Sequence, residues 1–532
     1  MPKKAKVVVH PAFEIGEISP RLYSAFLEPI GNMVDGSMYN PKHPTADSKG
    51  LRHDFIDAVK KSGIPAVRLP GGNFVSGWDW KDSIGPVEKR KAHLDLAWHQ
   101  YISNAVGHDE YLQWSELTGT EPLYTINLGT GDINDAIYCI EYTNHEGGTY
   151  WSDLRAEYGH KDPYNVKIWY LGNEMDGYWQ IGSYKKDPRA YGVLANEVSK
   201  AMKWVDPRIE TVACASCSPN MLHYPDWDKT VLEECYHTVD YISMHHYHSV
   251  LMNDIPTFVG ASRYFEDYIN TEAAMCDYLQ AKLKSDKKIM FSFDEYATMM
   301  RPAGEVHYGR GEYLHYKAHY YADPNRKYIR HDPNDMPFRG PRGNDMLGAL
   351  ANASTLLCFI RHADRVKIGC MTGGLHVVAS CDRDHVWQTA SAHPYMQLMR
   401  YGRGTSLRTS VDCDTYDIPS YIVDDTNQYY EQEGVDYIDT AAAYDKESGE
   451  VNIFVINRNQ DTSNDIELDV AGFEGLQFIE HIEMYTDDLS KANTYETPDA
   501  IVPVINPNAK FENGKLEANV KALSWNVFRF KM

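Results

Sequence analysis

The stretch VKIWYLGNE, residues 166–174, joins a run of apolar residues to an amide and a carboxylate, Asn173 and Glu174. A continuous apolar run of this length is typical of a strand in a parallel sheet, which is buried on both faces. A buried glutamate is unfavourable unless it is paired or takes part in chemistry. The stretch therefore predicts a core strand whose last residues reach a functional site.

Seven further apolar runs of the same kind occur between residues 20 and 390. They are LYSAFLE (22–28), AVRLPGG (66–72), PLYTINLGTG (122–131), TVACAS (211–216), VDYISMHHY (239–247), KIMFSFDEY (288–296) and RVKIGCMTGG (365–374). Helical patterns lie between them; in AYGVLANEVSKAMKWVDP (190–207), apolar residues recur at helical spacing and Pro207 follows the last turn. Eight alternations of strand and helix predict an α/β fold, a (β/α)₈ TIM barrel, over residues 20–388.

The pattern changes after about residue 390. Runs such as VNIFVINRN (451–459) and IELDVAGF (466–473) alternate in polarity, as strands with one buried face do, and turn signals separate them. We therefore predict a C-terminal antiparallel β-sandwich, jelly-roll-like, over residues 389–532. Residues 1–19 precede the barrel, and we expect their run KAKVVVHP to add an edge strand to this sandwich.

Charge and hydropathy limit the partners of the chain. A formal net charge of −23 argues against nucleic acid or an anionic membrane as the main partner. No stretch of the sequence approaches the roughly 20 apolar residues of a membrane helix. The N-terminus, MPKKAKVVVHPAFEIG, also lacks an apolar run of signal-peptide length. We therefore expect a cytoplasmic protein.

Polar residues end or follow most of the predicted strands. In (β/α)₈ barrels the active site lies at the C-terminal ends of the strands. The candidates there are Glu28, Arg68, Asn73, Asn173, Glu174, His245, Tyr247, Asp294 and Glu295. Strands four and seven lie nearly opposite each other in an eight-strand ring, so Glu174 and Glu295 can face each other. Two facing carboxylates are the apparatus of glycoside hydrolysis, in which one protonates the leaving oxygen and the other attacks the anomeric carbon.

The histidines of HHYH, residues 245–248, raise the question of a metal site. Successive side chains of a strand point to opposite faces of the sheet, so His245 and His246 cannot easily bind one ion. We therefore predict no metal ligand at this position, and no cofactor.

Six segments carry a resemblance that covers nearly the whole chain in order. They are RLPGGNFVSGWDWKDSIGP (68–86), HLDLAW (93–98), TINLGTG (125–131), WYLGNEMDGYWQIG (169–182), FIRHADRVKI (359–368) and RYGRG (400–404). With these segments the chain resembles the α-L-arabinofuranosidases of glycoside hydrolase family 51. The resemblance implies a (β/α)₈ barrel with a C-terminal β-sandwich, a retaining mechanism without a metal, and a homo-oligomer, commonly a hexamer.

The resemblance also implies roles for individual residues. Glu174 resembles the acid/base and Glu295 the nucleophile. Asn173 is expected to hold the sugar 2-hydroxyl, an interaction that strengthens in the transition state. The remaining substrate-binding positions implied are Glu28 and Asn73 as hydroxyl ligands, Arg68 and Tyr247 beside the nucleophile, His245 next to Tyr247, and Trp98 as an aromatic platform near the leaving group.

Two segments depart from the family pattern. Where the family usually reads DEWNVW, this chain reads DEYATMM, which places Tyr296 and Met299 where tryptophans are common. The segment TGGLHVVAS places Gly373 where the family has a sugar-contacting glutamine, and His376 where it has an asparagine. A lost amide and a lost indole predict a pocket of different shape. The segment 307–340, aromatic and basic, suits a lid or aglycone wall, or alternatively a subunit contact.

The sequence therefore predicts a retaining, exo-acting hydrolase that releases terminal α-L-arabinofuranosyl units from oligosaccharides. One alternative keeps the two-glutamate mechanism but acts on another glycoside, namely a galactofuranoside, a β-xyloside or a β-glucoside. A second alternative is a carbohydrate-binding relative without catalysis. Such a relative is expected to have lost one of the two carboxylates, whereas Glu174 and Glu295 are both present.

Overall fold

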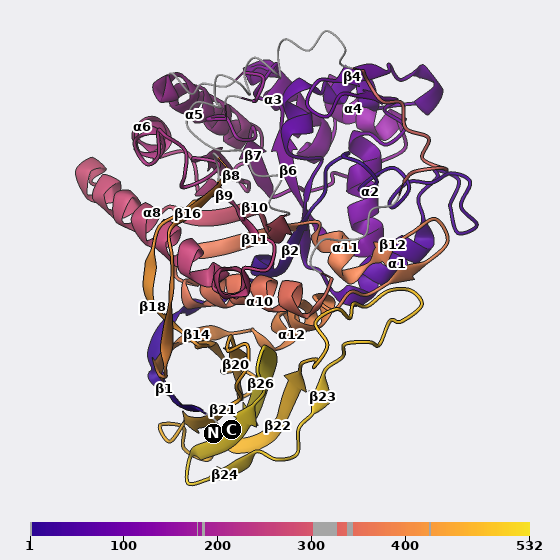
Figure 1. Ribbon diagram of the computed structural model, residues 1–532. Coiled ribbons are helices and arrows are strands. Elements are labelled where there is room, and N and C mark those ends of the chain that lie inside the picture. The colour runs from indigo at the N-terminus through magenta and orange to yellow at the C-terminus, as the bar shows by residue number, and fades with distance from the viewer. Residues whose placement is uncertain (1–2, 178, 183–186, 302–326, 338–343, 425–426) are drawn as a thin grey trace.

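The structure, a computed structural model, describes residues 3–177, 179–182, 187–301, 327–337, 344–424 and 427–532. Figure 1 shows two parts, a barrel of strands surrounded by helices and a separate β-sheet region below it. Both chain ends belong to the sheet region, so the chain starts there, builds the barrel, and returns.

Eight parallel strands form the closed barrel. They are β2 (Ser24–Phe26), β3 (Ala66–Leu69), β6 (Glu121–Ile126), β7 (Ile168–Leu171), β8 (Glu210–Cys214), β9 (Tyr241–Leu251), β10 (Met290–Arg301) and β11 (Val366–Thr372). The first strand, β2, pairs with β3 on one side and with β11 on the other, which closes the ring. Each strand overlaps one of the eight apolar runs, so the predicted barrel is confirmed.

Helices surround the barrel. They are α1 (His53–Ser62), α2 (His108–Thr118), α3 (Ile133–Asn144), α4 (Tyr150–Glu157), α5 (Pro188–Val205), α6 (Asp226–Cys235), α7 (Ile255–Val259), α8 (Ala261–Leu283), α10 (Met346–Arg361), α11 (Gly374–Val378) and α12 (Ala392–Tyr401). The predicted helix at 190–207 is α5. It begins at Pro188, directly after Asp187, whose side chain accepts a hydrogen bond from the Ala190 amide, and it ends at Val205, two residues before Pro207.

The sheet region contains ten strands in the order β23-β22-β26-β20-β19-β14-β1-β21-β25-β24. In chain order these are β1 (Lys3–Glu17), β14 (Thr405–Asp412), β19 (Ile438–Asp445), β20 (Glu450–Asn457), β21 (Asn464–Asp469), β22 (Gln477–Met484), β23 (Val504–Ile505), β24 (Lys510–Glu512), β25 (Lys515–Val520) and β26 (Ser524–Lys531). All pairs are antiparallel except β1 with β21.

The first strand occupies the interior of this sheet, so the expected edge position is wrong. It pairs with β14 on one side and with β21 on the other. Both edges of β1 are therefore hydrogen-bonded, and its Val7 and Val9 side chains are buried in the apolar core of the sheet region.

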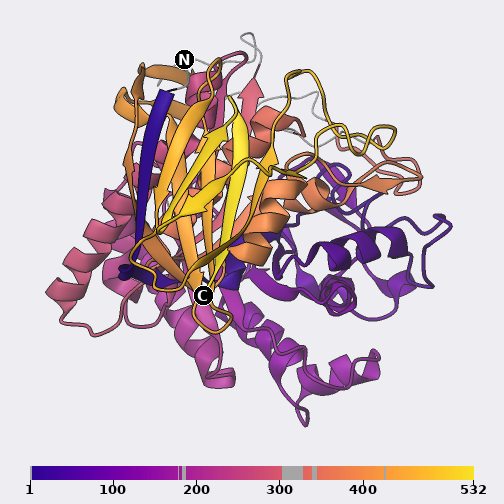
Figure 2. The ribbon, with the colours of Figure 1, turned by 90° about the horizontal axis from the view of Figure 1, so that it is seen from below.

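Strand β20 shows how the sheet packs on the barrel. Phe454 and Ile456 belong to the large core shared with the barrel, whereas Ile453 and Val455 belong to the core of the sheet itself. Figure 2 shows this sheet from below, lying across the barrel helices. Helix α12 connects the parts, because Tyr395 donates to the Ser24 carbonyl and Trp525 donates to the Gln397 side chain. The division between residues 388 and 389 stays a prediction.

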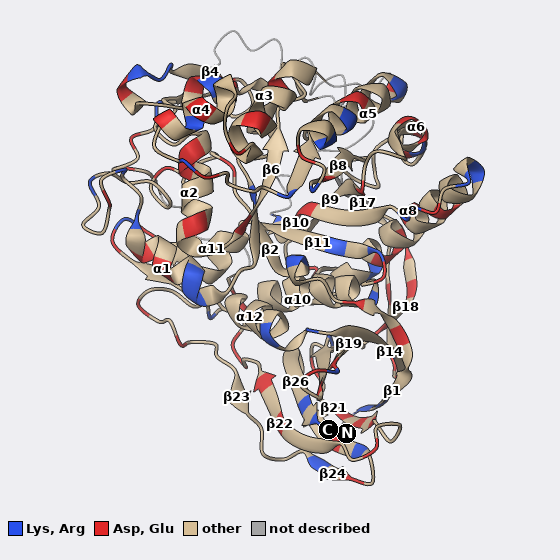
Figure 3. Cartoon of the chain, turned by 180° about the vertical axis from the view of Figure 1, so that it is seen from behind, with Lys and Arg blue, Asp and Glu red and all other residues tan. Residues whose placement is uncertain are grey.

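Charged residues lie mainly outside the barrel strands, on the surrounding helices and loops (Figure 3). In that view acidic and basic residues are interspersed on the helices. Among the described residues, no helix has the length and hydrophobicity that spanning a bilayer requires.

Candidate active site

The two predicted catalytic carboxylates meet at the C-terminal end of the barrel. Glu174 follows β7, and Glu295 lies within β10. One carboxylate oxygen of each, together with a ring nitrogen of His245, lie within 4.8 Å of one another. Retaining glycosidases place their carboxyl groups about 5–5.5 Å apart, and inverting enzymes about 6.5–9.5 Å apart. The geometry therefore fits direct attack by a carboxylate rather than by an activated water.

Glu174 lies in a tight turn after β7. Its φ is +44°, a left-handed conformation that is unfavourable for a glutamate and is found at functional sites. The Gly177 amide closes the turn on the Glu174 carbonyl at 2.8 Å. One carboxylate oxygen lies 3.0 Å from His245 Nδ1, and the other accepts a 2.6 Å hydrogen bond from Trp179 Nε1. Burial raises the pKa of Glu174, the hydrogen bond from His245 opposes this, and the charge of Glu295 adds to it.

Glu295 is held by two donors. Arg68 Nη1 donates to one of its oxygens at 2.8 Å, and the Tyr247 hydroxyl donates to the other at 2.7 Å. Arg68 is itself buried between the rings of Phe26 and Tyr170, whose centroids lie 5.1 and 4.9 Å from the guanidinium carbon. A fixed cation and a phenol thus orient the Glu295 carboxylate, as a nucleophile requires.

A chain of amides continues from Arg68. Its Nη2 donates to the Asn173 side-chain oxygen at 2.7 Å, and Asn173 Nδ2 donates to the Asn73 side-chain oxygen at 2.9 Å. Gln180 also donates to Asn73. These bonds fix the orientation of both asparagine side chains, so the structure brings Arg68, Asn73 and Asn173 together beside Glu295.

Glu28 lies on the other side of this group, on the loop after β2. It accepts hydrogen bonds from the Phe74 amide at 2.8 Å and from Trp98 Nε1 at 2.9 Å. A side chain at Gly72 would collide with it, because a β-carbon there would lie 2.7 Å from the carboxylate. Burial raises the pKa of Glu28 to about 8, and the charge of Glu295 contributes. Glu28 can therefore offer a proton to a substrate hydroxyl at neutral pH.

Comparisons with known proteins agree with this geometry. Residues 58–270 match the family described as "Alpha-L-arabinofuranosidase 1 domain", and residues 294–524 match "Alpha-L-arabinofuranosidase C-terminal domain". The chain is 37% identical to "Intracellular exo-alpha-(1->5)-L-arabinofuranosidase 1" of Bacillus subtilis over 99% of both chains. It is 36% identical to the similarly named enzyme of Halalkalibacterium halodurans, over 99% of this chain and 98% of that one.

The chain belongs to the α-L-arabinofuranosidases of glycoside hydrolase family 51. Solved structures agree with this assignment. A family 51 α-L-arabinofuranosidase from Bifidobacterium longum has a TM-score of 0.83 and 28% identity, with both chains covered completely. The arabinose complex of the Thermotoga maritima α-L-arabinofuranosidase has a TM-score of 0.83 and 25% identity, covering 99% of this chain and all of that one.

The structure places two of the residues that depart from the arabinofuranosidase pattern, Tyr296 and Gly373. Tyr296 does not line the pocket, because its ring packs against Phe359 and Phe265 on the helices, at centroid distances of 5.2 and 6.3 Å. The expectation that it reshapes the pocket is therefore wrong. Gly373, in contrast, has a φ of +76°, and apart from its chain neighbours no described residue has an atom within 4 Å of where its β-carbon would be. Its neighbour Thr372 lies 3.1 Å from the Tyr247 hydroxyl, so this open space adjoins the site.

Met299 and His376 lie away from the catalytic carboxylates. Met299 is half-buried near the end of β10 and contacts Arg301. His376 is buried in α11, where its Nε2 lies 3.0 Å from the Ser37 hydroxyl. Neither residue has a described contact with Glu174 or Glu295.

The segment 307–340 lies largely outside the described residues. Its described part, 327–337, pairs with the chain near Trp98 through mutual backbone hydrogen bonds of Ile329 with His99 and Tyr101. Arg330 lies over the Tyr101 ring, 4.4 Å from the centroid. This part therefore packs on the hairpin formed by β4 (His93–Asp95) and β5 (Gln100–Ile102).

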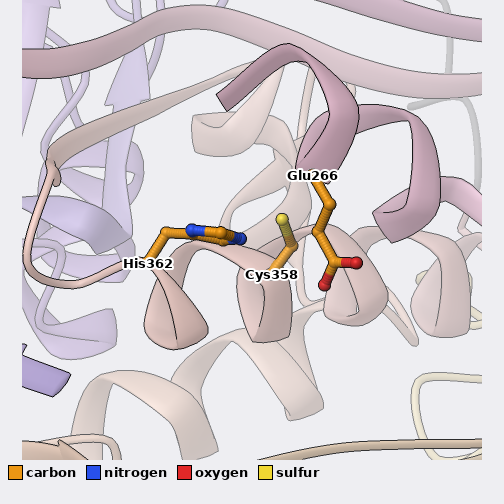
Figure 4. A group of neighbouring side chains, drawn as sticks. All are labelled: Glu266, Cys358 and His362. Carbon is orange, nitrogen blue, oxygen red and sulfur yellow. The ribbon is translucent and has the colours of Figure 1, made fainter. Parts of the chain in front are cut away.

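Side chains of metal-binding type also gather elsewhere. Among the described residues, Glu266 on α8, Cys358 on α10 and His362 directly after α10 have donor atoms within 4.8 Å of one another (Figure 4). Arg361 already donates to the Glu266 carboxylate at 2.8 Å, and burial raises the pKa of Cys358, which favours the thiol. We therefore assign this cluster to packing and ion pairing. In HHYH, His246 packs outward on Phe265, away from His245.

Trp179, Gln180 and Asp294 belong to the site but have no role predicted from the sequence. Trp179 contacts the acid/base directly, and Asp294 contacts both His245 and Arg68. Trp179 belongs to the segment WYLGNEMDGYWQIG, which carries the family resemblance, but the sequence does not predict its contact with Glu174. The sequence places Asp294 at a strand end as a carboxylate, but nothing in it separates Asp294 from a structural residue.

Proposed function

We propose that the protein is a retaining, exo-acting α-L-arabinofuranosidase that releases terminal α-L-arabinofuranosyl residues from oligosaccharides by double displacement. The observation that carries the proposal is the close approach of Glu174 and Glu295, within 4.8 Å, in a family 51 chain. We further propose that it acts inside the cell, since the relatives from Bacillus subtilis and Halalkalibacterium halodurans are named intracellular.

In the first step, a Glu295 oxygen attacks the anomeric carbon as the bond to the leaving oxygen breaks. Glu174 gives its proton to that oxygen, so the leaving group departs as a neutral alcohol. Burial and the charge of Glu295 both favour the protonated form of Glu174 before this step. The products are a glycosyl ester on Glu295 and an ionised Glu174.

In the second step, Glu174 takes a proton from water while the water oxygen bonds to the anomeric carbon. The ester bond breaks, and its electron pair returns to the Glu295 carboxylate. Because esterified Glu295 is neutral, it no longer raises the pKa of Glu174, and the acid becomes a base. Two inversions give arabinose with retained configuration.

The surrounding polar residues are proposed to bind the sugar. Asn173 precedes Glu174 in the chain and accepts from Arg68, which also donates to Glu295, so it is suited to the 2-hydroxyl. Asn73 is bonded to Asn173, and Glu28 accepts from the Phe74 amide next to Asn73. His245 and Tyr247 orient the two catalytic carboxylates. Trp98, half-buried and bonded to Glu28, is suited to an aromatic contact with the ligand.

Replacement of each carboxylate tests the assignment. Glu174→Ala should slow hydrolysis of an α-1,5-arabino-oligosaccharide by about 10²–10⁴-fold. With a 4-nitrophenyl arabinofuranoside, azide should restore turnover. The product should be arabinosyl azide of retained α configuration, without the β-anomer, as identified by NMR. Glu295→Ala should give no retained product with azide. Near-normal rates in Glu295→Ala would show that another residue is the nucleophile.

A second candidate substrate is suggested by the open space beside Gly373. A galactofuranoside, β-xyloside or β-glucoside would use the same two glutamates. A panel of nitrophenyl glycosides distinguishes them. Turnover of another glycoside without hydrolysis of the arabinofuranoside would exclude the first proposal, and no turnover of any would favour a carbohydrate-binding relative.

We also propose a homo-oligomer, with a hexamer as the state implied by family resemblance. Exposed apolar side chains such as Trp204 on α5, which is 79% exposed, offer surface for subunit contacts. Light scattering coupled to size-exclusion chromatography tests this, since a single 60.7 kDa species would contradict it.

A further inference from the structure

A bulge in β10 brings a second carboxylate into the catalytic centre. The pairing register of β10 shifts between Ser292 and Glu295 against β9, and between Phe293 and Tyr296 against β11. Phe293 and Tyr296 both pack outward on Phe359. In a regular strand neighbouring side chains alternate, whereas the extra residue at the bulge lets Asp294 and Glu295 both face the barrel interior.

Asp294 is completely buried and is surrounded by donors. One of its oxygens lies 3.1 Å from His245 Nε2, 3.0 Å from the Ser243 hydroxyl and 3.1 Å from Arg68 Nε. Burial would raise the pKa of Asp294, but the charges of Arg68 and His245 outweigh this and lower it. Asp294 is therefore an anion with no contact to Glu174.

His245 connects Asp294 with the acid/base. While Nε2 faces Asp294, Nδ1 lies 3.0 Å from one Glu174 oxygen and 3.8 Å from one Glu295 oxygen. The Ser243 hydroxyl also lies 3.3 Å from Nε2. Burial alone would lower the pKa of His245, but Glu295 and Asp294 raise it to about 10. The ring is thus a cation that donates from both nitrogens.

We propose that Asp294 is a positioning residue that keeps His245 a cation with Nδ1–H directed at Glu174, and so favours ionised Glu174 in the second step. The inference rests on the proposed double displacement. When Glu295 is esterified its charge is lost, and Asp294 is then the anion that keeps His245 protonated. His245 in turn stabilises the carboxylate that must remove a proton from water.

Asp294→Asn tests this role, since the amide keeps the shape but removes the charge. With 4-nitrophenyl arabinofuranoside, whose leaving group needs no acid, kcat should fall at least about tenfold, with KM falling in parallel. Azide, which needs no base, should restore most of kcat. The alkaline limb of kcat/KM on an arabino-oligosaccharide should move to higher pH, because Glu174 loses a cationic neighbour.

An alternative role acts through Arg68 on the nucleophile. In that case kcat/KM for the aryl substrate falls at every pH and azide restores nothing, which would overturn the proposal. Asp240→Asn is a matched control, because Asp240 precedes the same strand β9 at the opposite end of the barrel and binds Lys203 and Lys287. It should change neither the azide response nor the pH limb.

A second measurement keeps the proposal testable if Asp294→Asn does not fold. In wild-type protein labelled with ¹⁵N-histidine, the ring of His245 should remain protonated on both nitrogens at pH 8. The signal is assigned by its absence in His245→Gln. A neutral ring at pH 8 would overturn the proposal, and this readout does not depend on the sugar that the enzyme cleaves.

Discussion

Removing the single hydrogen bond from Tyr247 to Glu295 tests the assignment of Glu295 as the nucleophile. The Tyr247 hydroxyl donates to Glu295 at 2.7 Å, and a hydrogen bond to a charged group contributes about 1.5–3 kcal/mol. Tyr247→Phe should therefore lower kcat/KM for an aryl arabinofuranoside by about 10- to 100-fold, and it should also lower thermal stability, because the buried Glu295 carboxylate loses a donor. Steady-state kinetics and a melting curve measure both quantities.

Tyr241→Phe serves as the control for that change. Tyr241 lies on the same strand, β9, but its hydroxyl donates to Glu210 at 2.9 Å, near the N-terminal end of the barrel. It should leave kcat/KM within about twofold. Equal losses in the two variants would mean that the Tyr247 hydroxyl has no special role at Glu295.

The residues of the site differ in how far the sequence predicts them. Glu174 and Glu295 could be predicted because each follows an apolar run, and a parallel barrel brings such strand ends together. The contact of Trp179 with Glu174 could not, because it depends on a turn with φ +44°. The inward position of Asp294 depends on the bulge, which periodicity does not reveal.

At the scale of elements, α6 and α8 carry a buried pair of acids. Glu272 on α8 and Asp228 on α6 are both buried, and Glu272 faces Asp228 and the Tyr224 hydroxyl. Burial raises the pKa of Glu272 well above its usual value, and burial raises that of Asp228 to about 7. A protonated Glu272 can donate to Asp228, so the pair is favourable only while it holds a proton.

This pair predicts a pH dependence of stability. A carboxyl whose folded pKa is raised contributes stability that is present below the unfolded pKa, near 4.5, and is lost as pH rises toward the folded pKa. Glu272→Gln keeps a donor for Asp228 and does not titrate. Its free energy of unfolding should exceed that of the wild type by about 1 kcal/mol or more at pH 8, and less at pH 5.

Denaturant titrations at both pH values measure this difference. Glu157→Gln, at an exposed position on α4, is the control and should shift stability by less than about 0.5 kcal/mol at either pH. A Glu272→Gln variant that is less stable than the wild type at pH 8 would show that ionisation of the pair does not lower the free energy of unfolding.

Elements of the fold were predictable where their signal is local. The barrel strands are continuous apolar runs, and α5 has helical spacing with proline beyond its end. The interior place of β1 was not predictable, because its partner β21 begins at Asn464, far along the chain. A strand's polarity pattern shows which face is buried but not which strands flank it.

At the scale of the whole molecule, ion pairs of Asp439 join the sheet region to the barrel helices, in addition to the apolar core that the two parts share. Asp439 on β19 accepts from Arg361 of α10 at 2.7 Å and from the Ser354 hydroxyl at 2.7 Å, and it also pairs with Arg458. Burial would raise the pKa of Asp439, but the two guanidinium groups lower it. Asp439 is therefore an anion between two cations at the junction.

Asp439→Asn should weaken this junction, because it leaves the buried Arg458 and the half-buried Arg361 with one anion fewer. Removing one partner of a buried ion pair typically lowers the free energy of unfolding by about 3–5 kcal/mol. Urea denaturation followed by circular dichroism measures the loss, and limited proteolysis should then cut between α12 and β14. Asp445→Asn, at the other end of β19, bonds Ser448 within its own turn and should cost less than about 1 kcal/mol. If both variants lost equally little, the apolar core shared by β20 and the barrel helices would hold the two parts together without help from Asp439.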